Sequence, residues 1–267
     1  MTAFRSGISS TAAPFLWACI LLFVPGCHSG QKAAVSILDK VLVAHELRVG
    51  LTGDYPPFSY LNDRGEYEGI DVVLAMDLAE TLDAEVRFVK TTWPTLIADL
   101  KAGRFDMAIG GISKNLLRQR VGLFSKGYSI GGKTPIARCE DAGLYASLEQ
   151  IDRAGVRVIV NPGGTNQAFV NRNIHQATII VFDDNTAIFR EIREDRADVM
   201  ITDSEEVRLQ HKISPDLCPT MPGKTFDQFE KACLLPRDLI WKAYVDAWVE
   251  QRLLDGTIAG VFSRFLD

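Results

Sequence analysis

Two acidic side chains stand where a predicted strand ends and a predicted helix begins, a position suited to moving a proton. Asp203 and Glu206 follow the apolar segment 197–201. Their spacing fits a capping box, in which Asp203 caps the helix and Glu206 returns the bond. Alternatively, the strand end aims both acids into a ligand cleft. There, loss of solvent would raise the pKa of a carboxyl and let it act as a general acid. The residues alone leave both interpretations open.

A glycine pair in the segment 161–166 lies between another predicted strand and helix. Without side chains, Gly163 and Gly164 let the backbone approach a ligand closely, and free N–H groups at the helix start attract an anion. A simpler interpretation is that Thr165 or Asn166 merely caps the helix.

Two basic and two aromatic residues are further candidates for ligand contacts. The planar fork of Arg118 suits a carboxylate, although a surface arginine paired with an acid is the alternative. Lys133 could reach into a crevice or remain a solvated loop residue, while Tyr55 and Trp93 stand at junctions where cleft walls are usually built. Together with Asp54, these residues predict a cleft for a small molecule that carries a carboxylate.

Strand and helix patterns alternate along the chain, which predicts an α/β architecture with mainly parallel sheets. A first group contains strands over 48–51, 85–90 and 105–109 and helices over 70–82 and 93–102. After 131–135 a second group begins, with strands over 156–160, 178–182 and 197–201 and helices over 165–173, 185–194 and 205–212. A long helix over 239–254 and a shorter one follow.

This restart predicts two α/β lobes joined by a hinge of two segments. The first lobe is expected to comprise 46–132 and 229–267, and the second 136–226, with hinges near 131–135 and 226–230. Ligands of such proteins bind in the crevice at the carboxyl ends of the strands.

The composition excludes some partners and the N-terminus indicates export. A net charge of −5 without a basic patch argues against nucleic acid. Residues 1–26 read as a signal peptide, with Arg5 before an apolar run over 12–24 that is too short to span a membrane. Cys27 then either carries a lipid or lies near a simple cleavage site.

The cysteines of the mature chain predict one disulfide and no metal site. Cys139 and Cys218 lie in polar, loop-like segments, and an exported protein meets an oxidising compartment, so we expect them to pair. Cys233 lies in an apolar run, typical of a free core thiol. Neither a CxxC motif nor a Cys/His cluster with ligand spacing is present in the sequence.

Several segments resemble known proteins. The segments 53–60, 69–72, 105–108 and 124–128, with Arg118, resemble the bilobed periplasmic binding proteins for amino acids. A closer resemblance, to periplasmic cyclohexadienyl dehydratase, rests on five segments in that family's order: Thr92-Trp93-Pro94, Gly132-Lys133-Thr134-Pro135-Ile136, Asn161-Pro162-Gly163-Gly164-Thr165-Asn166, 202–209 and Leu234-Leu235-Pro236-Arg237-Asp238. The match spans about residues 45–250, and Cys139 and Cys218 fall at the family's cysteine pair.

This resemblance implies the type II periplasmic-binding-protein fold and an enzyme that needs no cofactor. The reaction would remove water and carbon dioxide from prephenate or arogenate, with Glu206 as the general acid. A tight clamp on the ring carboxylate would hinder its loss, so we expect Arg118 to hold the side-chain carboxylate, assisted by Thr165. The remaining substrate contacts are expected from Lys133, Asn161, Asn166, Trp93, Asp54 and Asp203, the last able to receive the ammonium of arogenate.

At three positions the chain departs from the family's pattern: Pro56, Gly110 and Gln167 replace a basic residue, a serine and an acid. These departures bear on substrate affinity and reaction rate rather than on the type of reaction. The alternative function is that of a non-catalytic, lipid-anchored binding protein that delivers a polar amino acid to an ABC permease. Either function places the mature protein in the periplasm.

Overall fold

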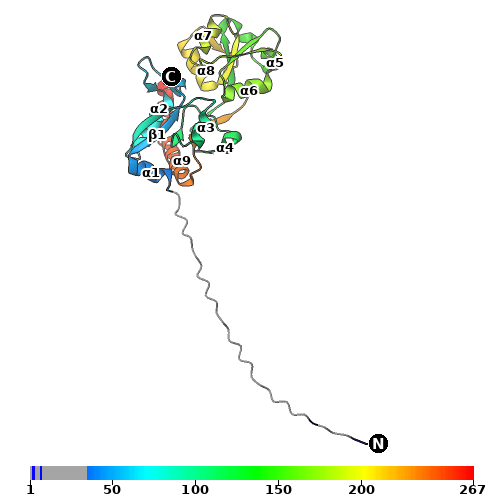
Figure 1. The fold of residues 1–267 in the computed structure, drawn as a ribbon. Helices are drawn as coiled ribbons and strands as arrows, with labels where there is room; N and C mark the ends of the chain where they lie inside the picture. The colour runs from blue at the N-terminus through cyan, green and yellow to red at the C-terminus, as the bar shows by residue number, and fades with distance from the viewer. Residues whose placement is uncertain (1, 4–6, 8–34) are drawn as a thin grey trace. The chain divides into compact units, whose positions relative to one another are not determined.

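A five-stranded sheet forms the centre of the first lobe (Figure 1). The computed structural model describes residues 2, 3, 7 and 35–267, so Cys27 and nearly all of the predicted signal peptide lie outside the described residues. The strand order is β5 (Glu85–Lys90), β1 (Glu46–Leu51), β6 (Met107–Ala108), β15 (Leu234–Leu235) and β7 (Leu123–Phe124). The first three strands are parallel, whereas β15 runs antiparallel to both of its neighbours.

The second lobe repeats this plan. Its sheet has the order β11 (Thr178–Val181), β10 (Arg157–Val160), β12 (Val199–Asp203), β9 (Lys133–Arg138) and β13 (Leu217–Pro219). Again three parallel strands are followed by an antiparallel one, here β9. The prediction of mainly parallel sheets is therefore wrong in this part of each sheet, because β9 and β15 each lead the chain back from a crossing between the lobes.

Helices cover both sheets. In the first lobe they are α1 (Ile37–Ala44), α2 (Ile70–Glu80), α3 (Leu96–Lys101), α4 (Leu116–Gln119), α9 (Leu239–Leu254) and α10 (Thr257–Leu266). Their buried side chains, such as Leu74, Trp241 and Val245, share a core with Val49 of β1. The second lobe contributes η1 (Cys139–Leu144), α5 (Leu148–Ile151), α6 (Thr165–Asn173), α7 (Ile188–Arg193) and α8 (Ser204–Ile213). Within the described part of the chain, no helix has the length and apolar character needed to cross a membrane.

Two short sheets complete the fold. β2 (Asp54–Tyr55), β3 (Ser59–Leu61) and β4 (Tyr67–Glu68) form one, directly after β1. The other pairs the two strands that connect the lobes, β8 (Ser129–Gly131) and β14 (Phe229–Lys231). Because these strands are antiparallel neighbours, Lys231 lies opposite Ser129.

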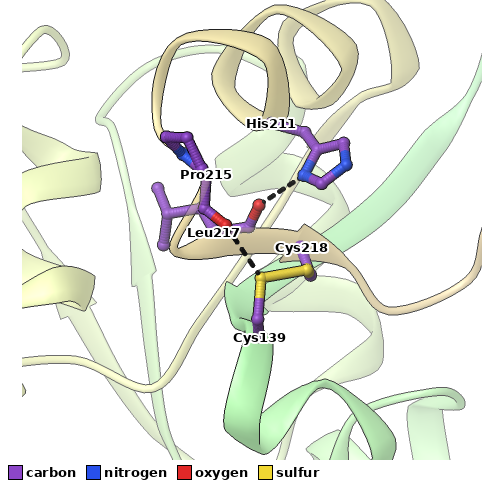
Figure 2. Close-up of a disulfide and its surroundings, with 5 residues drawn as sticks. All are labelled: Cys139, His211, Pro215, Leu217 and Cys218. Carbon is purple, nitrogen blue, oxygen red and sulfur yellow. Dashed lines mark hydrogen bonds between the residues drawn. A yellow bond between two sulfur atoms is a disulfide. The ribbon is translucent and has the colours of Figure 1, made fainter.

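The disulfide expected between Cys139 and Cys218 is confirmed (Figure 2). It joins the start of η1 to β13 across 79 residues of sequence. Beside it, His211 of α8 forms a hydrogen bond of 2.7 Å with the carbonyl of Leu217 (Figure 2). Cys233 is a buried free thiol, as expected.

Candidate active site

The site is built where β12 ends beside the start of β9. Their antiparallel register pairs Asp203 directly with Lys133. Both side chains are buried, and Lys133 Nζ donates to Asp203 Oδ1. Burial lowers the pKa of Lys133, although the charge of Asp203 opposes that effect. The strand register thus creates an ion pair between residues that are far apart in sequence.

The other oxygen of Asp203 faces the first lobe and the crossing strand. Asp203 Oδ2 accepts hydrogen bonds from the Tyr55 hydroxyl of β2 and from Lys231 Nζ of β14. Burial alone would raise the pKa of Asp203, but the two ammonium groups outweigh it and hold this pKa well below its usual range. Asp203 is therefore an ionised carboxylate surrounded by three donors.

The capping-box interpretation is wrong. Asp203 occupies the N-cap position of α8 but makes no side-chain capping bond, because both of its oxygens are used elsewhere. Glu206 does not return toward that cap either. Its Oε2 accepts a 2.5 Å hydrogen bond from Thr202 Oγ1.

Glu206 is fully buried, and only one of its two carboxyl oxygens has a hydrogen-bond partner among the described residues. Its side chain has no exposed surface, and Oε1 has no hydrogen-bond partner among the described residues. Burial raises the pKa of Glu206 to about 8; the bond from Thr202 lowers it and the nearby charge of Asp203 raises it further. Glu206 can therefore hold a proton at neutral pH and still release it, as a general acid must.

A hydrogen-bonded chain joins Lys133 to Glu206. Lys133 Nζ donates to Asn166 Oδ1 and, over 3.1 Å, to Thr165 Oγ1. Asn166 Nδ2 donates in turn to Thr202 Oγ1 over 3.0 Å, and Thr202 binds Glu206. The capping interpretation of Thr165 and Asn166 is therefore also wrong, since Gly164 is the N-cap of α6 and these side chains face the site.

The glycine loop before α6 meets the first lobe. Gly163 has φ +79°, and a Cβ atom there would lie 2.6 Å from Pro94 Cγ. Gln167, one of the three departures, accepts a 2.8 Å hydrogen bond from the N–H of Gly163 and so braces this loop. Only a residue without a side chain allows the two lobes to approach here.

Some of these groups line a small, partly open cavity with about 230 Å³ of empty space up to its mouth. It is lined by Tyr55, Trp93, Gly111, Asn161, Gly164, Thr165, Asn166 and Asp203. Trp93 Nε1 is buried without a hydrogen-bond partner in the described range. A larger hollow, about 970 Å³ of empty space up to its open mouth, is lined by Lys133 and shares Thr165 with the cavity. The two spaces therefore adjoin at the start of α6.

Four of the expected site residues are not among those that line the small cavity: Asp54, Arg118, Lys133 and Glu206. Arg118 is buried, and its Nη1 donates to the carbonyl of Ser113 over 3.1 Å. Burial lowers its pKa to about 10, although the charge of Asp203 opposes the effect. No salt bridge in the range 35–267 includes Arg118. The alternative interpretation, that Arg118 is a surface arginine paired with an acid, is therefore wrong. Asp54 is half-buried, and burial raises its pKa. Glu206 is linked to Asn166 of the cavity lining through Thr202.

The residues missed from the sequence are Lys231 and the role of Tyr55 as a donor to Asp203. Lys231 has no exposed surface, and its Nζ also donates to Gly111 O over 2.8 Å and to Ser113 Oγ over 3.0 Å. A lysine in the strand-like run before Ala232 and Cys233 was the available signal. Across the described residues, no group of three or more His, Cys, Asp or Glu side chains could hold a metal ion.

Comparison with known proteins agrees with this architecture. The chain is 47% identical to the cyclohexadienyl dehydratase of Pseudomonas aeruginosa, over 87% of this chain and 85% of that protein. It is 28% identical to the L-cystine-binding protein TcyJ of Escherichia coli, over 91% and 90% of the two chains. Among solved structures, the ancestral amino acid-binding protein AncCDT-1, a precursor of cyclohexadienyl dehydratase, superposes with a TM-score of 0.81 at 30% identity, covering 87% of this chain and all of that one. Residues 47–267 match a family sequence profile, and the chain belongs to the bacterial extracellular solute-binding proteins, family 3.

Proposed function

We propose that this protein is a cyclohexadienyl dehydratase, which converts prephenate to phenylpyruvate or arogenate to phenylalanine. The observation that carries the proposal is Glu206, a fully buried carboxyl with a pKa raised to about 8 beside an ion-paired, cation-rich cleft. The reaction requires a general acid, whereas ligand binding alone does not. The 47% identity to a cyclohexadienyl dehydratase supports the same reaction.

The reaction needs one proton and an oriented substrate. The bond between the ring and its carboxylate breaks, carbon dioxide leaves, and the electron pair expels the ring hydroxyl. Glu206 gives its proton to that hydroxyl, which departs as water, and later regains a proton from solvent. Aromatisation supplies the driving force, so positioning and general-acid catalysis suffice.

Glu206 Oε1 is the oxygen we assign to this proton. A buried polar atom without a partner is rare in a folded protein and asks for an explanation. The ring hydroxyl of the substrate would complete its bonding. Thr202 and Asn166 connect Glu206 to the cavity wall and would hold its other oxygen in place.

The other site residues would bind and orient the dianion. Arg118, buried and without an acid, would hold the side-chain carboxylate, with Thr165 assisting. Lys133, Asn161 and Asn166 would orient the ring end. Trp93 would wall the ring, and Asp54 would accept a hydrogen bond from the substrate.

The proposal extends to the lobes and to the location of the protein. We assign the lobes to 46–132 with 229–267 and to 136–226, with hinges near 131–135 and 226–230. Residues 1–26 would direct export to the periplasm and then be removed, and Cys27 would be the residue available for a lipid anchor.

The decisive experiment incubates the mature protein with prephenate and follows phenylpyruvate. We expect the change Glu206→Gln to lower kcat by about 10²- to 10⁴-fold, the usual contribution of a general acid, while prephenate still binds. Glu205→Gln is the matched control, because Glu205 lies in the same turn but accepts its bonds from Ser129 and Ser204. Full turnover by the Glu206 variant would refute the assigned role.

The second candidate function is non-catalytic amino-acid binding, which the similarity to the L-cystine-binding protein TcyJ of Escherichia coli supports. Under it, the protein would deliver an amino acid to an ABC permease and would form no product. No phenylpyruvate, together with tight binding of an ordinary amino acid, would favour this function over the first.

A further inference from the structure

Lys231 is a buried lysine that the proposed chemistry does not use. Its ammonium donates to the carbonyl of Gly111 over 2.8 Å, to Ser113 Oγ over 3.0 Å and to Asp203 Oδ2. Gly111 and Ser113 belong to the first lobe, Asp203 belongs to the second, and Lys231 itself lies on the crossing strand β14. Three acceptors match the three N–H bonds of an ammonium group, so the cation is fully satisfied.

Aromatic rings enclose the same ammonium group. The ring centroids of Phe229, Phe58 and Tyr55 lie 5.0, 5.1 and 5.6 Å from Lys231 Nζ. Each ring face attracts a cation at such distances and excludes water from it. The ammonium of Lys231 is therefore held against Asp203 and has no solvent to which it could turn.

The cavity wall consequently offers few free acceptors. Asp203 accepts from Lys133, Lys231 and Tyr55. The side-chain oxygens of Asn166 and Thr165 accept from Lys133, and Asn161 Oδ1 accepts from Asn166 over 3.2 Å. Trp93 Nε1, in contrast, is a donor without a partner in the described part of the chain. The cavity is thus suited to a group that accepts hydrogen bonds.

We propose that Lys231 is a positioning residue that determines substrate specificity. Because its ammonium donates to Asp203 Oδ2, this oxygen is no longer available to accept a hydrogen bond from a substrate ammonium. The inference rests on the proposed function and deepens it. The site should then prefer the 2-oxo acid prephenate to the amino acid arogenate. An ammonium placed against Asp203 would find both oxygens of that carboxylate already occupied and would meet the like charges of Lys133 and Lys231. An oxo group brings no N–H and can accept from a donor.

The test compares kcat/KM for prephenate and arogenate in three proteins: the wild type, Lys231→Met and the control Lys126→Met. Lys126 pairs with Glu250 at the surface, where its side chain is half exposed. We expect the wild type to prefer prephenate by at least about tenfold. Lys231→Met should shrink that ratio by about tenfold, mainly through a lower KM for arogenate, and Lys126→Met should leave it unchanged. A loss of packing alone would lower both activities together and leave the ratio intact.

A binding measurement keeps the inference testable if Lys231→Met does not fold. Phenylpyruvate and L-phenylalanine differ only at the oxo or ammonium group, so calorimetry on the wild type isolates that group. We expect phenylpyruvate to bind at least about tenfold more tightly. Equal or tighter binding of L-phenylalanine, or an unchanged ratio in a folded Lys231→Met protein, would overturn the inference. Failure of the wild type to convert either substrate would instead refute the dehydratase function.

Discussion

Asp203 and Glu206 lie three residues apart, and their surroundings move their pKa values in opposite directions. Two ammonium groups outweigh burial at Asp203 and keep it charged, whereas burial dominates at Glu206 and keeps it protonated. Such a separation distinguishes the group that holds charge from the group that delivers a proton. The distinction depends on which lysines face which oxygen, and helical spacing alone does not reveal it.

The pKa of Glu206 sets a pH dependence with a definite sign. A general acid works only when protonated, and kcat/KM reports the pKa of the free enzyme, so kcat/KM should be nearly constant below pH 8 and should fall above it by about tenfold per pH unit. The measurement is a profile of kcat/KM for prephenate from pH 5 to 10, alongside circular dichroism to check folding. A profile that rises with pH across this range would show that the essential group acts as a base.

Arg118 offers a test of carboxylate binding. Lysine retains the charge but lacks the planar fork, so Arg118→Lys should raise KM for prephenate by about tenfold or more and change kcat less. Arg120→Lys is the matched control, since Arg120 is exposed in the same short segment. Steady-state kinetics on both variants would decide, and an unchanged KM for Arg118→Lys would remove this residue from the substrate contacts.

For the helices and strands, local sequence patterns predicted the bounds of several elements but did not predict how the strands pair. The strand Glu85–Lys90 and the helices Thr165–Asn173 and Leu239–Leu254 have the expected bounds, because their apolar periodicity and end signals are local. α1 was not expected, and neither was the strand β9. Strand pairing depends on contacts distant in sequence, which periodicity does not encode.

The same limit explains which parts of the site were predictable. Asn166 and Asp203 were expected as site residues because each stands between a predicted strand and a predicted helix, and Lys133 because it stands at the predicted crossing between the lobes. Lys231 was missed because its role arises only when the crossing strand β14 lies against both lobes. The orientation of Asp203 away from its own helix also required the register between β9 and β12.

The disulfide is an element-scale feature with a measurable effect. It ties the start of η1 to β13 across 79 residues, so its loss should increase the conformational entropy of the unfolded chain. Replacing both Cys139 and Cys218 by serine should lower the free energy of unfolding by about 2–5 kcal/mol. Urea denaturation of this variant and of the reduced wild type checks the value. Turnover per folded molecule should persist, because the bond lies away from the cavity residues.

For the whole molecule, the approach of the two lobes depends on specific contacts. Tyr55 of the first lobe donates to Asp203, and Asn185 Nδ2 of the second donates to the carbonyl of Asp54 over 2.8 Å. Gly163 lies so close to Pro94 that a side chain would collide with it. These contacts assemble the cavity from residues of both lobes.

Gly163→Ala should therefore hinder closure. We expect a KM for prephenate raised by about tenfold or more and a smaller decrease in the radius of gyration on ligand binding, measured by small-angle scattering. Gly155→Ala is the matched control: Gly155 also has a positive φ, +92°, but a Cβ atom there would meet nothing within 4 Å. Equal effects of the two changes would indicate that backbone strain, rather than contact between lobes, is responsible.

Cys233 gives the molecule a built-in kinetic reporter. It follows Lys231 by two residues, its thiol is buried, and among residues 35–267 it is the one cysteine outside the disulfide. A thiol reagent can reach it only when the segment between β14 and β15 detaches from the hydrophobic core that holds Cys233. The rate of thiol labelling therefore reports the rate of local unfolding next to β14. Any ligand that stabilises the contact between the lobes should lower this labelling rate.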